Sequence, residues 1–288
     1  MSGIHNFGLI ITAFRTSQDI HLIHCYHLII HDSRTVKNRY NNIKRGINDQ
    51  GGIHMRPELL ELEKFEEGNP VNKERDKFNR RNEALLYHND PVGVLFIGDS
   101  ITAYWDLDSY FELTNGKRII NRGISNDRSM YLKRRFQADA LQLKPDYIIL
   151  SIGVNNTKDL DQQLDQETSD QLVMQITQDI KDMVSMAETQ HIPMAITSVT
   201  ATNRRHLKSF ELRAATIKRI NDELQQFAQR QRIPYIDYYS RMTLTGDVDC
   251  LNPELSDDGL HPHVLGYDIM AQTVVDTLTD VPLKLKHP

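Results

Sequence analysis

Short apolar runs alternate with longer amphipathic stretches along most of the chain. The apolar runs, which are candidate strands, lie at residues 92–97, 118–121, 147–152, 193–199 and 234–238. The amphipathic stretches, in which apolar side chains recur every three or four positions, lie at 72–87, 129–141, 168–189, 210–230 and 264–278. Strands that alternate with helices of this length predict parallel pairing, because parallel neighbours need a long crossover connection.

This alternation predicts an α/β fold. We expect a three-layer sandwich with a mainly parallel central sheet of about five strands, covered by helices on both faces. In such folds ligands bind beyond the carboxyl ends of the strands. Residues that directly follow each strand are therefore the first candidates for chemistry.

The beginning of the chain lacks the alternation. Residues 1–54 contain apolar patches that are too short for a membrane span, and they lack the pattern of a secretory signal. Helix-compatible composition begins just after Met55. We expect a poorly patterned leader at 1–54 that is not native to the protein, a helical extension at 55–90 and the main domain at 91–288.

Composition narrows the class of protein. A chain of 288 residues with 39% hydrophobic residues can bury a full core. The net charge of −5 supplies no basic field, so nucleic acid is not an expected partner. The two cysteines, Cys25 and Cys250, are far apart and suggest neither a disulfide framework nor a zinc site, so we expect a cytoplasmic protein. The polar helices are compatible with a monomer or a homo-oligomer.

The first apolar run breaks sharply into Gly98, Asp99 and Ser100. A serine between a strand and a helix holds its hydroxyl at the rim of the sheet, beside backbone N–H groups that have no helical acceptor. The same three residues are also ordinary turn composition, in which Asp99 braces the turn. The rest of the chain decides between a nucleophile and a simple turn.

Two further blocks lie at the ends of predicted strands, NRGISND at 121–127 and SIGVNN at 151–156. A fourth block, DGLHP at 258–262, lies near the C-terminus. With the four blocks in this order, the chain resembles the SGNH hydrolases, also called the GDSL esterase and lipase family. The resemblance covers about residues 91–279. It implies an SGNH-hydrolase, flavodoxin-like fold for the domain at 91–288.

The resemblance also implies a role for each matching residue. Ser100 matches the nucleophile, and its backbone N–H matches one donor of the oxyanion hole. The Gly123 N–H and the Asn155 side-chain amide match the other two donors. His261 matches the general base, and Asp258 matches the carboxylate that orients it. Asn156 stands where the family commonly has Asp, which leaves one supporting hydrogen bond in question.

These residue types suit acyl transfer. A serine hydroxyl is a poor nucleophile at neutral pH, so an imidazole must accept its proton and return it to the leaving group. Tyr104, Trp105 and Asn126 are the candidate substrate contacts, although Tyr104 and Trp105 also fit a core or wall position. Water completes the reaction, and the resemblance implies no metal or organic cofactor.

A metal site is the alternative for the acidic and histidine-rich end of the last block. It would use Asp257, Asp258, His261 and His263. Such a site would leave Ser100 without a role, and we therefore favour the serine mechanism.

The sequence thus predicts a serine esterase that forms an acyl-enzyme on a small-molecule ester. The mean hydropathy of −0.50 and the lack of a long apolar lid favour a short acyl group, with acetyl on a carbohydrate as the leading candidate. A lysophospholipase or thioesterase for longer acyl chains is the alternative. A noncatalytic module that binds a glycan or an acyl group is a further alternative.

Overall fold

The computed structural model describes residues 56–60 and 62–287. Contacts divide the chain after Pro57, and the unit that begins at Glu58 contains every element discussed below. The predicted leader at 1–54, which contains Cys25, and Met55, the first residue of the expected extension, lie outside the described residues.

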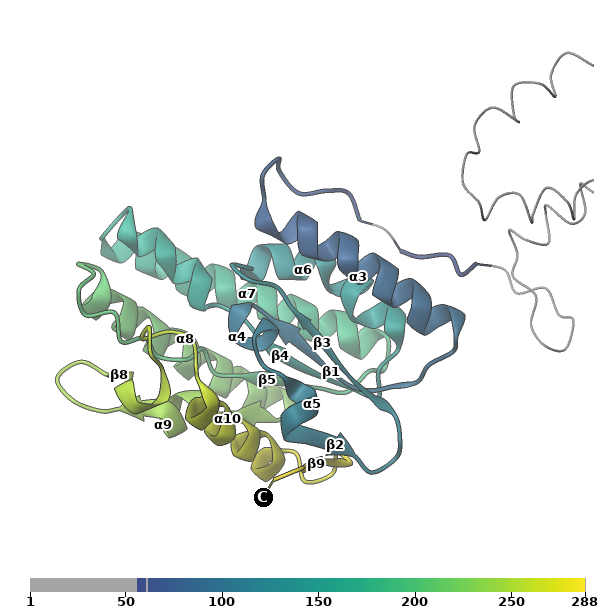
Figure 1. Cartoon of the computed structure of the whole chain (residues 1–288). Helices are drawn as coiled ribbons and strands as arrows, with labels where there is room; N and C mark the ends of the chain where they lie inside the picture. The colour runs from purple at the N-terminus through teal and green to yellow at the C-terminus, as the bar shows by residue number, and fades with distance from the viewer. Residues whose placement is uncertain (1–55, 61, 288) are drawn as a thin grey trace, which may run out of the picture. The chain divides into compact units, whose positions relative to one another are not determined.

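Five parallel strands form the central sheet in the order β3-β1-β4-β5-β6 (Figure 1). They are β1 (Val92–Gly98), β3 (Arg118–Gly123), β4 (Tyr147–Ser151), β5 (Met194–Thr197) and β6 (Tyr235–Ile236). Strand β1 is buried along its whole length, which explains its unbroken apolar sequence. The predicted α/β fold with a parallel sheet is confirmed.

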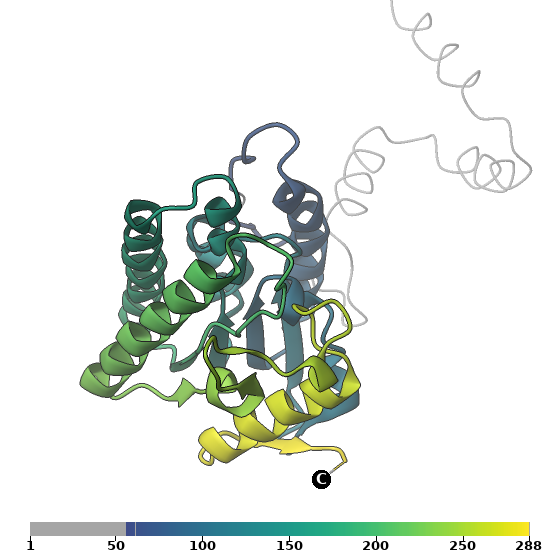
Figure 2. The ribbon, with the colours of Figure 1, turned by 90° about the vertical axis from the view of Figure 1, so that its left-hand side faces the viewer.

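Three long helices follow successive strands and cover one face of the sheet. They are α6 (Ser129–Asp139), α7 (Gln166–Thr189) and α8 (Phe210–Gln231). The chain moves in one direction from β3 to β6, and right-handed crossovers then place these helices on the same face. Figure 2 shows α7 and α8 side by side, in agreement with their contacts.

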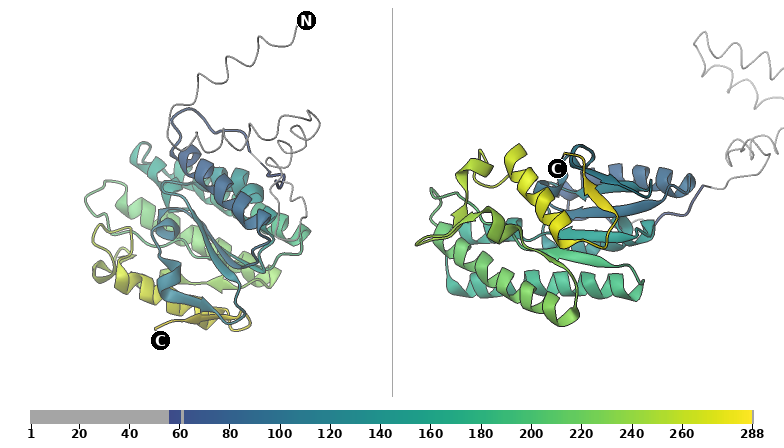
Figure 3. Two further views of the ribbon diagram at one scale, coloured as in Figure 1. Left: turned by 45° about the vertical axis from the view of Figure 1, so that its right-hand side comes forward. Right: turned by 90° about the horizontal axis from the view of Figure 1, so that it is seen from below.

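The opposite face carries α10 (Val264–Thr277) and the short α5 (Leu107–Tyr110), as the right-hand view of Figure 3 shows for α10. An aromatic cluster joins them to the sheet. The ring of Trp105 lies 5.7 Å from Phe96 of β1 and 5.2 Å from Tyr267 of α10. These contacts fix the helices that frame the carboxyl end of β1.

Helix α3 (Pro70–Tyr87) joins the same unit, although it precedes the first strand. Arg75 donates to Asp139 at 3.1 Å, and the Asn82 Oδ1 accepts from Arg122 at 2.7 Å. The boundary expected at residue 90 therefore marks the start of the sheet, and α3 packs with the main domain.

The remaining elements are short. Two antiparallel pairs, β2 (Phe111–Leu113) with β9 (Leu283–Leu285) and β7 (Thr243–Leu244) with β8 (Cys250–Leu251), lie outside the main sheet and were not predicted. The short helices are α4 (Ser100–Ala103), α9 (Tyr238–Met242), η2 (Leu141–Leu143), η3 (Val154–Asp161) and η4 (Pro253–Leu255). No helix among the described residues combines the length and apolar character needed to span a membrane.

Candidate active site

Ser100 lies where β1 ends and α4 begins. The Asp99 side chain caps α4 by accepting the Ile101 N–H at 2.9 Å. Ser100 is the first residue of the helix, so its own N–H has no intrahelical acceptor. Asp99 thus braces the turn, as the sequence suggests, and the Ser100 N–H stays available.

His261 and Asp258 lie in the loop between η4 and α10. His261 is 161 residues after Ser100 in the sequence. The Ser100 Oγ lies 2.9 Å from the His261 Nε2. On the other side of the ring, the His261 Nδ1 lies 2.7 Å from the Asp258 Oδ2. The structure therefore joins these three side chains in one hydrogen-bonded series.

The loop holds the Asp258 carboxylate with its own backbone. The Asp258 Oδ1 accepts the N–H groups of Leu260 at 2.9 Å and His261 at 2.7 Å. Burial tends to raise the pKa of Asp258, but the hydrogen bonds from the His261 N–H, the His261 ring and Leu260 outweigh it and hold that pKa well below its usual range. Asp258 is therefore a carboxylate throughout the neutral range.

Gly259 lets this loop pass close to its neighbour. Its φ is +72°, and a Cβ on it would lie 2.5 Å from the Asn203 carbonyl oxygen. The Asn203 N–H in turn donates to the Gly259 carbonyl at 2.7 Å. A side chain at this position would displace the loop that carries His261.

Arg204 is a site residue that the sequence analysis missed. Its Nη2 lies 3.2 Å from the Asp258 Oδ2, the same oxygen that faces the His261 ring. Arg204 follows the carboxyl end of β5, where residues of an α/β fold tend to meet a ligand. That position was the available signal, since no motif marks the arginine.

Asn155 is buried at the start of η3. Its Nδ2 donates to the Asp127 carbonyl at 3.2 Å, which uses one of the two amide hydrogens. The other hydrogen remains for a ligand. The residue is 2% exposed, and this hydrogen bond orients its side-chain amide.

The neighbouring Asn156 has a clear structural role. Its Oδ1 accepts the Ser129 N–H and its Nδ2 donates to the Ser129 Oγ, both at 3.0 Å. The Ser129 hydroxyl donates to Asp179 at 2.7 Å. A carboxylate at position 156 could not donate to this hydroxyl, so asparagine complements Asp179 and maintains the supporting hydrogen bonds.

The expected donor role of Gly123 needs correction. Its N–H donates to the Asn121 Oδ1 at 2.8 Å, on the side of β3 that faces away from β1. A Cβ on Gly123 would collide with the backbone of Ala103, so the glycine permits close approach of α4. Asn121 also donates to the Thr102 and Trp105 carbonyls at 2.7 and 3.0 Å, and it is a second residue that sequence reasoning missed.

Asn126 lies on the turn that follows β3. The Asp127 N–H donates to the Ile124 carbonyl at 3.2 Å, and Asn126 adopts a φ of +62° within this turn. No described residue accepts the Asn126 N–H in a hydrogen bond. Asn126 and Asn155 line one cavity of about 510 Å³.

Buried ion pairs hold Asp127, which ends the turn that contains Asn126. The Arg135 guanidinium lies 2.8 Å from Asp127 and 3.2 Å from Asp139, and all three side chains are 0% exposed. Burial raises the pKa of Asp127 to about 6, against the opposing effect of Arg135. Burial also raises the pKa of Asp99 to about 7, although the Ile101 N–H acts to lower it.

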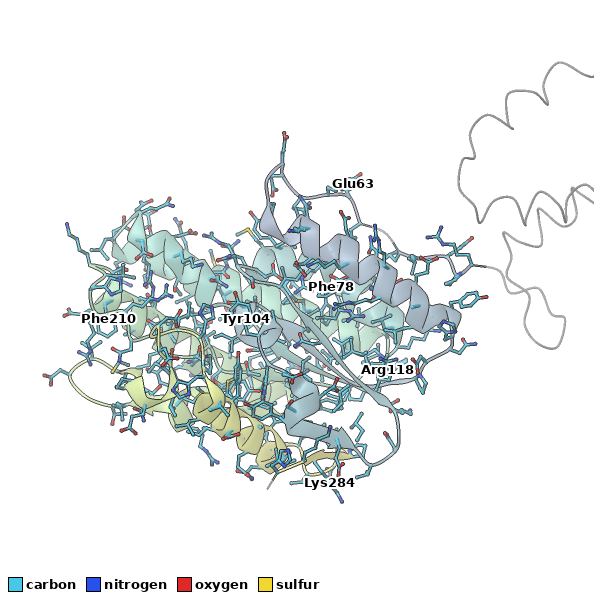
Figure 4. All side chains as sticks on the ribbon, in the orientation of Figure 1. Glu63, Phe78, Tyr104, Arg118, Phe210 and Lys284 are labelled. Atoms are coloured by element: carbon cyan, nitrogen blue, oxygen red, sulfur yellow. The ribbon has the colours of Figure 1, made fainter. Side chains whose placement is uncertain are left out.

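The two predicted aromatic contacts differ in position. Tyr104, which is labelled in Figure 4, is 59% exposed. Its ring lies 5.2 Å from that of His261, and it lines a cavity of about 440 Å³. Trp105 borders the same cavity but is 3% exposed and packs in the aromatic cluster. Burial gives Trp105 a core role, and Tyr104 is the better placed of the two to contact a substrate.

The metal alternative has little geometric support. No group of three metal-binding side chains occurs within residues 56–60 and 62–287. Asp258 and His261 bind each other, and the His263 Nδ1 accepts the Leu265 N–H at 3.3 Å at the start of α10. These side chains are thus used for positioning the loop and the helix.

Comparisons with known proteins identify the family of the chain. The family model described as the GDSL-like Lipase/Acylhydrolase family matches residues 96–269, more than half of the chain. No curated protein matches the chain.

Solved structures are also similar. A GDSL-like lipase from Bacteroides thetaiotaomicron is 25% identical, with a TM-score of 0.59 over 70% of this chain and 95% of that chain. A mutant acetylxylan esterase from Geobacillus stearothermophilus is 19% identical, with a TM-score of 0.51 over 65% and 94% of the two chains, and shows a shared fold. The chain belongs to the GDSL-like lipase/acylhydrolase family and is a carboxylic ester hydrolase.

Proposed function

We propose that the protein hydrolyses a short-acyl ester through an acyl-enzyme on Ser100. The hydrogen-bonded series of Ser100, His261 and Asp258 carries this proposal, at 2.9 and 2.7 Å. The Ser100 Oγ attacks the ester carbonyl while the His261 Nε2 accepts its proton, which then passes to the leaving alcohol. Water attacks the acyl-enzyme with His261 again as base. Asp258 orients the ring and stabilises its transient positive charge.

Three donors would stabilise the tetrahedral oxyanion. They are the Ser100 N–H, the free hydrogen of the Asn155 amide and the Asn126 N–H, which takes the place expected for Gly123. Asn126 therefore serves as a backbone donor as well as the predicted lining residue. Fixed donors of this kind are typically worth about 2.7–4 kcal/mol of barrier each.

The polar surroundings of Asn155 favour an acetylated carbohydrate as the substrate. Side-chain amides of Asn69, Asn126 and Gln162 line the cavity beside it, together with Tyr131. Such groups exchange hydrogen bonds with sugar hydroxyls, and they offer little to a long hydrocarbon chain.

A longer acyl chain is the second candidate, because large exposed side chains lie near His261 in space or in sequence. The Tyr104 ring lies 5.2 Å from the His261 ring, and Val264 and Leu265 follow His261 by three and four residues. These three residues are 59%, 61% and 53% exposed. They could cover the first carbons of a fatty acyl chain in a lysophospholipase or thioesterase.

An acyl-length series separates the two candidates. We expect kcat/KM for aryl esters to be highest for acetyl and to fall with chain length, whereas a maximum at eight or more carbons would reject the short-acyl proposal. A fluorophosphonate probe should label the wild-type protein and not Ser100→Ala. Labelling that persists in this variant would remove Ser100 as the nucleophile.

A further inference from the structure

The cavity beside Asn155 carries positive charge that the acyl-transfer chemistry does not use. Lys158, Arg128 and Asp159 contribute its charged side chains. Arg128 is paired with Asp159 at 2.9 Å, which leaves the ammonium group of Lys158 as the net charge. This local positive charge contrasts with the net charge of the whole chain, which is −5.

Lys158 lies close to two of the proposed oxyanion donors, Asn155 and Asn126. It lies three residues after Asn155 in the 3₁₀-helix η3, where side chains at this spacing share one face. Its Nζ donates to the Asn126 Oδ1 at 2.8 Å. An ammonium group has three hydrogens, so two remain for a ligand in the cavity.

No carboxylate of the described residues forms an ion pair with Lys158. Burial lowers the pKa of Lys158, and Arg204, Arg128 and Arg213 lower it further, against the attraction of the buried Asp99. Each of these arginines is paired with a carboxylate, so Lys158 is the cation that remains for an anion in the cavity.

We propose that Lys158 binds an anionic group of the substrate beside the oxyanion hole, so that the preferred substrate is an acylated acidic sugar. The proposal rests on the ester hydrolysis proposed above and specifies its substrate class. A carboxylate, sulfate or phosphate on the sugar would accept the two free hydrogens of the ammonium group. The neighbouring amides would bind the sugar hydroxyls.

Two substrates that differ by one charge test the proposal. They are a methyl glucuronoside and a methyl glucoside that carry an acetyl group on the same hydroxyl. We expect wild-type kcat/KM to be about 10- to 100-fold higher for the acidic sugar, because the neutral glucoside lacks the carboxylate that would accept hydrogen bonds from Lys158. Lys158→Met should bring the ratio close to one, mainly through KM, and Lys158→Arg should retain a preference for the acidic sugar.

Lys284→Met is the matched control. It removes the same charge from β9, away from Tyr104 in Figure 4, and should leave the ratio unchanged. A fall in the ratio equal to that of Lys158→Met would attribute the preference to overall charge and overturn the assignment.

The outcomes distinguish this proposal from the proposed function. Equal wild-type kcat/KM for the two sugars overturns the anion site and leaves the esterase intact. If neither sugar is deacetylated although phenyl acetate is hydrolysed, the carbohydrate substrate is rejected. Competitive inhibition of phenyl acetate hydrolysis by inorganic phosphate then decides the anion site: weaker inhibition of Lys158→Met supports it, and equal inhibition overturns it.

Discussion

Arg204 and Asp258 form an ion pair, with the Nη2 of the arginine 3.2 Å from the Oδ2 of the carboxylate. That oxygen also faces the Nδ1 of His261 at 2.7 Å. The carboxylate is thus held by its own loop through backbone N–H groups and by a second loop through the guanidinium group.

Replacement of Arg204 should have a small effect on catalysis. The two side chains are 29% and 45% exposed, and exposed ion pairs contribute about 0–1 kcal/mol. We expect Arg204→Gln to lower kcat/KM by about two- to fivefold, because the backbone N–H groups still orient Asp258. Steady-state kinetics on an aryl acetate measure this change. A loss as large as that of Asp258→Asn would show that the arginine, and not the loop backbone, orients the carboxylate.

The proposed catalytic residues should respond in a graded way. Ser100→Ala and His261→Ala should each lower kcat by about a millionfold. Asp258→Asn should lower it by about ten-thousandfold and Asn155→Ala by about a hundred- to a thousandfold. Urea unfolding of each variant serves as the control for folding. Similar small losses for all four would contradict the assigned roles.

Asn156 and Asp179 should be energetically coupled through Ser129. Asn156→Asp places a second buried carboxylate on the Ser129 hydroxyl, and we expect it to lower the free energy of unfolding by about 1–3 kcal/mol. Asp179→Asn in the same chain should recover part of this loss, because one amide and one carboxylate then share the hydroxyl. Urea unfolding of both single variants and the double variant gives the coupling energy. Additive effects would disprove the coupling.

Asp99 should make stability depend on pH. Its pKa rises from about 3.9 in the unfolded chain to about 7 in the folded protein. The folded protein therefore holds this proton more tightly, and the stability that results is complete below pH of about 4 and is lost as pH rises through about 7.

Asp99→Asn isolates this effect while keeping an oxygen that can cap α4. Between pH 4 and 8, the free energy of unfolding of the wild-type protein should fall relative to the variant by about 2–4 kcal/mol. Denaturant unfolding at several pH values measures the difference. A difference that does not change with pH would show that Asp99 has an ordinary pKa in the folded protein.

The main sheet and the long helices could be predicted because their buried faces require apolar residues in a regular pattern along the sequence. The run at 92–97 became β1 (Val92–Gly98), and the stretch at 210–230 became α8 (Phe210–Gln231). The strands β2 and β9 were missed because each has three residues and pairs with a partner that is distant in sequence. Such strands leave too short a pattern for a prediction.

Site residues within the motifs were easier to predict than those outside them. Ser100, Asp258 and His261 lie in recognisable blocks, whereas Arg204 reaches Asp258 from a loop that carries no motif. The expected role of Gly123 as an oxyanion donor is wrong because the N–H groups of a strand point alternately to its two sides, and the sequence does not show to which side this one points. The sequence shows a glycine after a strand, but it does not show that the N–H faces Asn121.

The ion pairs of α3 also bear on where the protein can be shortened. Arg75 neutralises Asp139, which is in turn bonded to Arg135 beneath the turn that carries Asn126. Trimming the chain to the first strand would remove Arg75 and Asn82 together and leave Asp139 and Arg122 inadequately compensated in the interior. We therefore expect the minimal folded hydrolase to begin before α3, upstream of residue 96, where the match to the family model starts.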